Sequence, residues 1–476
     1  MPTQLETSAA GIRFRRALSL LVMTLLLPGS AQLVAGNART GRVALRTCAA
    51  IGVLLVLVIA AGLVRPALVT AVLFSPVALG LLRAVLVLLA LGWAVLFVDA
   101  WRLGDPLGLQ QRQRLAVFSL NGALCFVVSG ALLFGSHLVE VHRSLIVEMF
   151  GSGVESSADN GRYNVLLLGG DAGETRSGMR PDSLTVASID EETGRTVLVG
   201  LPRNLENVPF PAGTPMAEAF PDGFDCGSEC LLNAIYTWAA DNRGRFDPDI
   251  EDVGAYATKL AVQEITGLKI NYYVMVDLRG FQDLVDAVGG VTVNVAQRVP
   301  IGGGSSEITG WIEPGRRHLD GFHTLWFARS RETSDDYSRM ARQKCVMSAM
   351  LNQLRPATVL VHFQDIAEAS QRTVTTDIPA SQLSSFVDLA AKAKELPVST
   401  VSIVPPKIQT YDPDYDTIAA MVDEAVAKAE AADQGVQADP AAGSEELTAA
   451  ERKERRERRA LNEQANDTGD LSRACG

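Results

Sequence analysis

The chain contains 476 residues, of which 47% are hydrophobic and 20% are charged, and its formal net charge is −11. Residues 1–142 contain 11 Arg, no Lys and 4 acidic residues, whereas the remainder has a net charge of −18. A nucleic-acid-binding protein needs a net basic face, and a purely soluble enzyme does not concentrate its apolar residues at one end. Both classes are therefore excluded, and we predict a membrane anchor followed by a polar domain.

The N-terminal region, residues 1–142, contains three stretches that are long and apolar enough to cross a bilayer, which takes about 20 residues. These predicted spans are residues 46–64, 77–98 and 115–134. An earlier apolar stretch, 17–35, is interrupted by Pro28-Gly29-Ser30 and has Arg on both sides. Because basic flanks favour the cytoplasmic side, we interpret this stretch as re-entrant or interfacial and expect the C-terminal part to be extracytoplasmic. A cleaved signal peptide and a four-span topology are the alternatives.

A polar linker, residues 143–162, precedes an alternation of predicted strands and helices over residues 163–406. The predicted strands are residues 163–170, 183–189, 196–201, 272–276, 291–295 and 400–404. The predicted helices are residues 231–241, 250–266, 278–288, 319–328, 336–354, 359–370 and 379–396. Such alternation favours a layered α/β domain with a central sheet. The tail, residues 407–476, is charged and poor in large apolar residues, so we expect a frayed helix or disorder there.

The six cysteines divide into two groups. Cys48 and Cys125 lie inside predicted spans and are expected to act as small hydrophobic residues. The other four lie in the polar part and are disulfide candidates: Cys226, Cys230, Cys345 and Cys475. An even number of cysteines outside the membrane is typical of an oxidising compartment with one or two disulfides, and all three pairings remain open. A zinc site is the alternative, although no His residues lie near the CxxxC spacing.

Aspartate and arginine residues gather at the predicted strand ends, whereas no GxSxG, P-loop or HExxH motif is present. Asp171 directly follows the first strand, Arg180 and Asp182 precede the second, and Arg203 follows the third. Several arginines bind phosphate oxygens through bidentate forks, and aspartates hold Mg²⁺, which bridges a pyrophosphate. This cluster therefore predicts a phosphoryl-transfer site that acts by positioning and charge stabilisation.

A second cluster of charged residues lies in the segment FARSRETSDDYSRMARQ. Its candidate residues are Arg329, Arg331, Asp336, Arg339, Arg342 and Gln343. From Asp336 to Gln343 the spacing is three, three and one, which places these residues near one helical face. For any single arginine, ion pairing at the surface is the alternative to phosphate binding.

The ordered motifs NVLLLGGD, RPDS, LPRN, LLNAIYTWA and LDGFHTLWFARSRETSDDYSRMARQ resemble the LytR-CpsA-Psr family of bacterial cell-wall proteins. The resemblance covers roughly residues 163–354. It implies an α/β/α domain with a central mixed sheet and a hydrophobic cavity for a polyprenyl-pyrophosphate lipid. It also implies Mg²⁺-dependent transfer of a glycopolymer from that lipid onto peptidoglycan. The multi-span anchor and extra cysteines are similar to the actinobacterial branch, whose polymers include arabinogalactan.

The resemblance assigns roles to individual residues of this sequence. Those matching the family's metal-associated carboxylates are Asp171, Asp182 and Asp336. Those matching its pyrophosphate contacts are Arg180, Arg203, Arg329, Arg331, Arg339, Arg342 and Gln343. The residues expected to be catalytic are Asp171, Arg329 and Arg331.

The sequence departs from the family pattern at two positions. Asn204 stands where the family has a carboxylate, and Leu232 replaces a common lysine. Leu232, Ile235 and Tyr236 lie on a predicted helix that we expect to line the prenyl pocket, although an ordinary core helix would show the same residues. The departures favour one alternative to the transferase, a non-catalytic protein that binds the lipid carrier and organises wall assembly. A pyrophosphatase that acts on the same lipid, with water as the attacking group, is a second alternative.

Overall fold

The computed structural model describes residues 4–65, 72–150, 153–171, 180–227, 229–303, 306–332, 336–353, 374–394 and 396–433. It divides into two compact units, which we call the membrane unit (Met1–Val147) and the polar unit (Glu148–Gly476). The predicted helix 359–370, the end of the tail and Cys475 lie outside the described residues.

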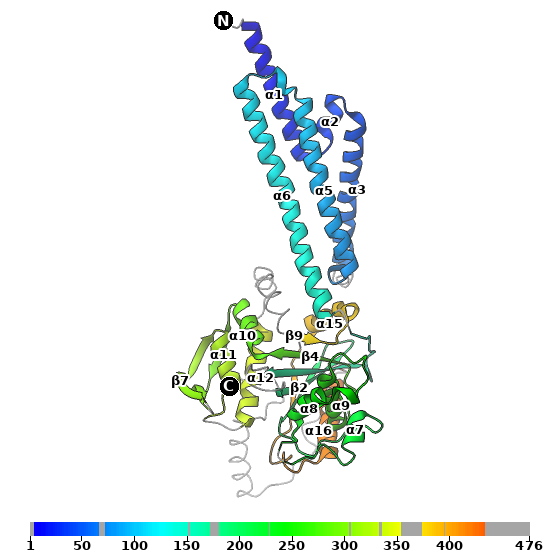
Figure 1. Ribbon diagram of the computed structural model, residues 1–476, viewed down its shortest axis with the longest axis vertical. Coiled ribbons are helices and arrows are strands. Elements are labelled where there is room, and N and C mark those ends of the chain that lie inside the picture. Colours follow the sequence, from blue (N-terminus) through cyan, green and yellow to red (C-terminus); the bar gives the residue numbers. More distant parts are fainter. Residues whose placement is uncertain are drawn as a thin grey trace. The chain divides into compact units, whose positions relative to one another are not determined.

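The membrane unit is built from helices α1 (Gln4–Leu26), α2 (Ser30–Ala35), α3 (Ala38–Val64), α5 (Pro76–Leu103) and α6 (Gln111–Phe150), with one short 3-10 turn at Pro106–Gly108 (Figure 1). Helices α3, α5 and α6 are long and apolar enough to cross a membrane. They contain the three predicted spans.

The apolar stretch at residues 17–35 forms two helices that are separated at the predicted Pro-Gly-Ser break. Leu20 and Leu21 of α1 are buried against Phe97 and Ala100 of α5. At the contact between α2 and α3, a Cβ on Gly41 would lie 2.7 Å from the Gly29 carbonyl oxygen, so this approach requires glycine.

Helix α6 continues well past residue 134, where the predicted third span ends. Residues 136–150 contain neither glycine nor proline, so nothing interrupts the helix before Phe150. Residues 143–150, which were expected to belong to a linker, are therefore helical.

The polar unit has a six-stranded sheet in the order β10-β3-β2-β1-β4-β9. Its strands are β1 (Arg162–Asp171), β2 (Arg180–Asp190), β3 (Thr196–Leu201), β4 (Tyr272–Asp277), β9 (Val374–Thr376) and β10 (Ser399–Ser402). The β1–β4 and β3–β10 pairs are parallel and the other pairs are antiparallel, so the sheet is mixed, as predicted.

Alternate residues of a strand point to opposite faces of the sheet, and here both faces carry apolar side chains. Helices therefore cover both faces. The helices on the first face are α8 (Ile235–Asp241), α9 (Val253–Thr266) and α16 (Tyr415–Asp433), and Leu166 and Leu168 of β1 pack in the core that they form. On the second face, Leu198 and Leu167 contact Met347 of α12 (Asp336–Gln353), and Val165 packs near Phe386 of α15 (Ala380–Ala393). The predicted α/β/α architecture is thereby confirmed (Figure 1).

A second, smaller core packs beside the sheet. It combines two ribbons and three helices, namely β5 (Val291–Val295), β8 (Gly315–Leu319), β6 (Val299–Gly303), β7 (Ser306–Ile312), α10 (Leu278–Ala287), α11 (Gly321–Arg329) and α12. Val293, Phe327 and Val346 are buried in this core. The remaining short elements are α7 (Pro215–Ala219) and 3-10 turns at Leu232–Ala234 and Arg243–Arg245.

The packed domain extends beyond residue 406, where the predicted domain ends. Ile418 and Val422 of α16 are fully buried in the main core. Their spacing of four residues places both on one face of α16, and this face packs against α9. The Ala/Glu/Lys-rich segment therefore contributes an ordered helix up to Asp433.

Candidate functional site

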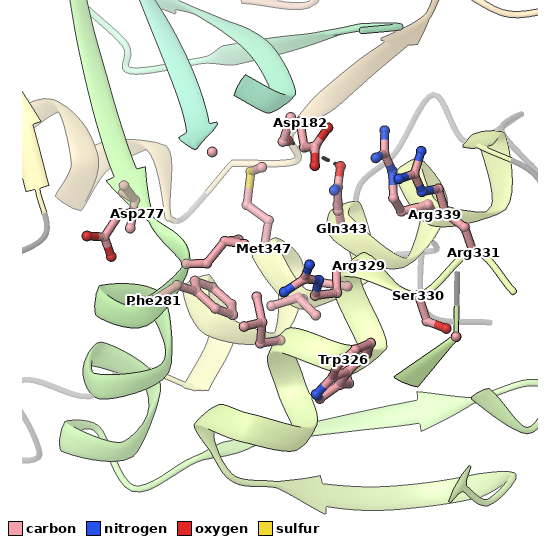
Figure 2. Close-up of a pocket in the computed structure, with 18 of the residues that line it drawn as sticks. Asp182, Asp277, Phe281, Trp326, Arg329, Ser330, Arg331, Arg339, Gln343 and Met347 are labelled. Carbon is pink, nitrogen blue, oxygen red and sulfur yellow. Dashed lines mark hydrogen bonds between the residues drawn. The ribbon is translucent and has the colours of Figure 1, made fainter. Parts of the chain in front are cut away.

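A pocket of about 670 Å³ lies between one edge of the sheet and helices α10, α11 and α12 of the polar unit (Figure 2). Its apolar lining is formed by Val276, Leu278, Phe281, Leu325, Trp326, Ala328, Val346, Met347 and Met350. Its charged lining is formed by Asp182, Asp277, Arg329, Arg331, Glu332 and Arg339. The cavity can therefore hold a molecule that has both an apolar part and an anionic part.

The strand ends meet at this pocket because of the sheet register. Strands β1 and β4 are parallel and end side by side, with Gly170 paired to Asp277. Strand β2 begins at the same edge, where Arg180 pairs with Asp171. This brings Asp182 to the pocket wall. The backbone of Asp171 lies at the same edge, whereas its side chain is outside the described part of the structure.

The arginines come from the end of α11, the residues that follow it and one face of α12. The Arg329 guanidinium carbon lies 5.1 Å from the centroid of the Trp326 ring, a cation–π contact. Figure 2 shows Arg331 and Arg339 together at one end of the pocket and Asp277 at the other. The positive charge is thus concentrated at one end.

Gln343 connects α12 to the sheet at the same place. Its Oε1 accepts a hydrogen bond from Ser183 Oγ at 3.2 Å (Figure 2). The pocket therefore contains five of the predicted site residues with described side chains: Asp182, Arg329, Arg331, Arg339 and Gln343.

Three predicted phosphate contacts do not line the pocket. Arg203 forms an ion pair with Asp182, so its charge acts on the site through that carboxylate. The Arg180 guanidinium lies 3.6 Å from a carboxylate oxygen of the exposed Glu229. Arg342 Nε donates a hydrogen bond to the Phe327 carbonyl at 2.7 Å and holds the end of α11. Arg342 lies near the same face of α12 as Arg339 and Gln343, but it contacts the end of α11 and does not line the pocket.

The predicted lipid-pocket residues belong to the main core and not to the wall of this pocket. Leu232 and Ile235 have no exposed surface, and the Tyr236 hydroxyl donates a hydrogen bond to Asp252 Oδ2 at 2.8 Å. The apolar wall is supplied instead by α10, α11 and α12, with Phe281 and Met347 at its centre (Figure 2). The assignment of the lipid pocket to Leu232, Ile235 and Tyr236 is corrected accordingly.

This correction predicts different results for two alanine substitutions. Ile235→Ala should lower the free energy of unfolding by about 2–5 kcal/mol, because it leaves a cavity in the core, and should leave the KM for a lipid-linked donor unchanged. Met347→Ala should raise that KM, because it removes a wall contact. Urea unfolding and donor titrations measure both effects, and a raised donor KM for Ile235→Ala alone would contradict the correction.

The two departures from the family pattern also lie away from the pocket lining. Asn204 Nδ2 donates a hydrogen bond to Thr410 Oγ1 at 3.1 Å. Leu232 is fully buried in the main core. Neither substitution removes a group from the wall of the pocket.

Lys344 is a buried group that the sequence did not single out. It is 8% exposed on α12, and its Nζ donates a hydrogen bond to Ser402 Oγ of β10. Burial lowers the pKa of Lys344 to about 8 from its ordinary value of 10.5. Between these two pH values the unfolded chain binds more protons than the folded chain, so stability rises with pH across this window. Below about pH 8, Lys344 is protonated in both the folded and the unfolded chain, so the folded chain bears the full free-energy cost of burying this charge.

Replacing Lys344 with methionine is therefore expected to raise the Tm at pH 7, and the gain should shrink as the pH approaches 10. Thermal unfolding at both pH values measures this difference. Lys407→Met, at an exposed position, is the matched control and should leave the Tm unchanged. A Lys344→Met protein less stable than wild type at pH 7 would contradict the prediction.

Three cysteines in the described part of the polar unit are disulfide-bonded. Cys226 is bonded to Cys230, and Cys345 is disulfide-bonded as well. Cys48 and Cys125 in the membrane unit are free thiols. The local pairing is one of the three that the sequence left open.

The donor set at the sheet edge is compatible with a hard cation. Carboxylate oxygens are the ligands that Mg²⁺ prefers, and the register places Asp171 close to Asp182. Within the described residues, no group of three or more His, Cys, Asp or Glu side chains is arranged to hold a metal. The side chains of Asp171 and Asp336 fall outside that set, so their metal roles remain predictions.

A profile of the LytR_cpsA_psr family matches residues 136–428, more than half of the chain. The chain therefore belongs to this family, and the resemblance inferred from the motifs is confirmed.

Curated relatives are similar over about half of the chain. Biofilm regulatory protein A of Streptococcus mutans is 27% identical over 239 residues, which cover 48% of this chain and 53% of that protein. The polyisoprenyl-teichoic acid–peptidoglycan teichoic acid transferase TagU of Bacillus mycoides is 27% identical over 251 residues, covering 52% and 71%. The chain thus spans little more than half the length of the first relative. Among solved structures, B. subtilis TagV has a TM-score of 0.40 and 23% identity, with coverage of 56% of this chain and 98% of TagV.

Proposed function

We propose that the polar unit transfers a glycopolymer from a polyprenyl-pyrophosphate carrier onto peptidoglycan. The observation that carries this proposal is the composition of the pocket, where an apolar wall adjoins a cluster of guanidinium groups. A prenyl chain fits the first and a pyrophosphate the second. The name of the TagU relatives describes a transfer of the same class. Arabinogalactan is the polymer that we would test first.

The cellular location follows from the two units taken separately. Three helices of the membrane unit are long and apolar enough to anchor the chain. Disulfides persist in oxidising compartments, and the polar unit contains the Cys226–Cys230 bond. We therefore propose a multi-pass membrane protein whose polar unit is extracytoplasmic.

The residues of the chain bind and orient the donor. Phe281, Leu325 and Met347 hold the prenyl chain and keep water from the reacting phosphate. Arg329, Arg331 and Arg339 fix the pyrophosphate oxygens and stabilise the charge that develops on the departing prenyl phosphate. The Arg203–Asp182 pair holds the Asp182 carboxylate at the sheet edge.

We propose Mg²⁺ as the cofactor, held by Asp182 and Asp171 together with the substrate, with Asp336 as a further candidate ligand. When bound, the ion would neutralise charge on the pyrophosphate.

The proposal is tested with the full chain in lipid nanodiscs, a polyprenyl-pyrophosphate oligosaccharide, Mg²⁺ and a peptidoglycan fragment. Mass spectrometry should detect a sugar-phosphate adduct on the fragment. Release of prenyl phosphate without an adduct would identify a pyrophosphatase. Donor binding without turnover would identify a carrier-binding protein.

A further inference from the structure

The rim of the pocket carries an acidic side chain that the proposed function has not used. Glu332 lines the pocket next to Arg331 and is exposed to solvent. The prenyl chain and pyrophosphate of the donor occupy the interior, so the second substrate has to enter where the pocket meets solvent. Glu332 stands at that boundary.

The position of Glu332 is set by the β6–β7 ribbon. A Cβ on Gly303 would lie 2.8 Å from both Cβ and Oε2 of Glu332, so the carboxylate side chain packs directly against the backbone of this glycine. Gly302 and Gly303 themselves line the pocket. Gly302 and Gly303 thus form the part of the rim against which Glu332 packs.

The two other carboxylates among the described lining residues, Asp182 and Asp277, are less exposed to solvent than Glu332. Asp182 is ion-paired with Arg203. Asp277 Oδ1 accepts a hydrogen bond from the Gly280 N–H at 2.6 Å and caps α10. Glu332 follows the end of α11 on a non-helical segment and is exposed, so an acceptor hydroxyl can reach it from solvent.

We infer that Glu332 is the catalytic residue that accepts the proton of the acceptor hydroxyl, an inference that rests on the proposed transferase function. The hydroxyl oxygen forms a bond to the sugar-linked phosphorus of the donor, and the bond from that phosphorus to the bridging oxygen breaks. Its electron pair leaves with the prenyl phosphate. The hydroxyl proton passes to the Glu332 carboxylate and from there to solvent. The product is a phosphodiester that joins the polymer to the acceptor.

The first test uses Glu332→Gln in the full chain in nanodiscs with the same donor and peptidoglycan fragment. Its kcat should fall about 100-fold, in line with the loss of a general base, while the donor KM stays within about twofold of wild type because the donor contacts are intact. Glu332→Asp should recover part of the rate. Glu313→Gln, at an exposed position between β7 and β8, is the matched control and should transfer at the wild-type rate.

The second test distinguishes a base from a structural group. An acceptor whose hydroxyl is made more acidic by a neighbouring fluorine needs less help to lose its proton. The factor by which Glu332→Gln lowers kcat should therefore be clearly smaller with the fluorinated acceptor than with the ordinary one. An equal loss of kcat with both acceptors, or full activity of Glu332→Gln, would overturn the inference.

A third variant displaces Glu332 without changing its chemistry. Gly303→Ala should reproduce the loss, because its Cβ occupies the space of the Glu332 side chain. Gly315→Ala controls for backbone strain, since Gly315 has nearly the same φ (103° against 102°) and nothing within 4 Å of a Cβ. If wild type transfers and Glu332→Gln matches it, only this inference fails. If wild type forms no adduct, the proposed function fails and the inference falls with it.

Discussion

Replacing Arg329 with alanine is expected to lower kcat/KM for glycopolymer transfer by about 10³-fold. Arg329 ends α11 inside the pocket and stacks on Trp326. During transfer, negative charge accumulates on the departing prenyl phosphate, and a guanidinium held in place stabilises that charge in the transition state. Arg329→Lys should recover little, because an ammonium group lacks the planar fork and the stacking surface.

The measurement is the initial rate of adduct formation at saturating Mg²⁺, together with a thermal melt that shows that the variant is folded. Arg316→Ala is the matched control, because Arg316 is exposed on β8 and does not line the pocket. A folded Arg329→Ala protein that transfers as fast as wild type would refute the assignment of this site.

The other large effect is expected from Asp182→Asn, which should reduce transfer by about 10³-fold and raise the Mg²⁺ concentration needed for half-maximal rate. The substitution removes a charged ligand candidate at the sheet edge. It also removes the carboxylate that forms an ion pair with the Arg203 guanidinium.

The same strand provides a control of the same chemistry. Asp190 lies at the other end of β2, 3.8 Å from the guanidinium of the buried Arg162, and accepts a hydrogen bond from the Thr193 N–H. Asp190→Asn should lower the Tm and keep kcat. If both variants lose activity in proportion to their Tm, Asp182 acts only through stability and the prediction is wrong.

Five of the six strands of the main sheet could be predicted from the sequence because they are short runs of apolar residues, whereas the three-residue strand β9 was not predicted. Strands β3 and β5 have the predicted bounds, since their β-branched residues are enclosed by turn-forming residues. Strands β6 and β8 were missed. The first ends in two glycines and contains Pro300, and the second exposes Arg316 and Arg317, so neither has the pattern of a half-buried strand.

The charged residues of the pocket could be predicted from the sequence, whereas the apolar residues could not. Asp and Arg residues at strand ends and helix ends are recognisable because they interrupt apolar runs. The apolar wall combines Phe281, Leu325 and Met347 from three helices that only the fold brings together. Residues 231–241 have the same amphipathic pattern as such a wall, and burial in the core cannot be separated from a ligand contact by periodicity alone.

The pocket lies between the main sheet and the smaller hydrophobic core beside it. The sheet contributes Gly169 and Ser183 on one side, and the small core contributes Phe281 and Met350 on the other. A molecule that fills the pocket touches both sides, so its binding free energy adds to the cohesion between them. Under the proposed function, the bound donor lipid would stabilise the contact between the two cores, and release of prenyl phosphate would weaken this contact until the next donor binds.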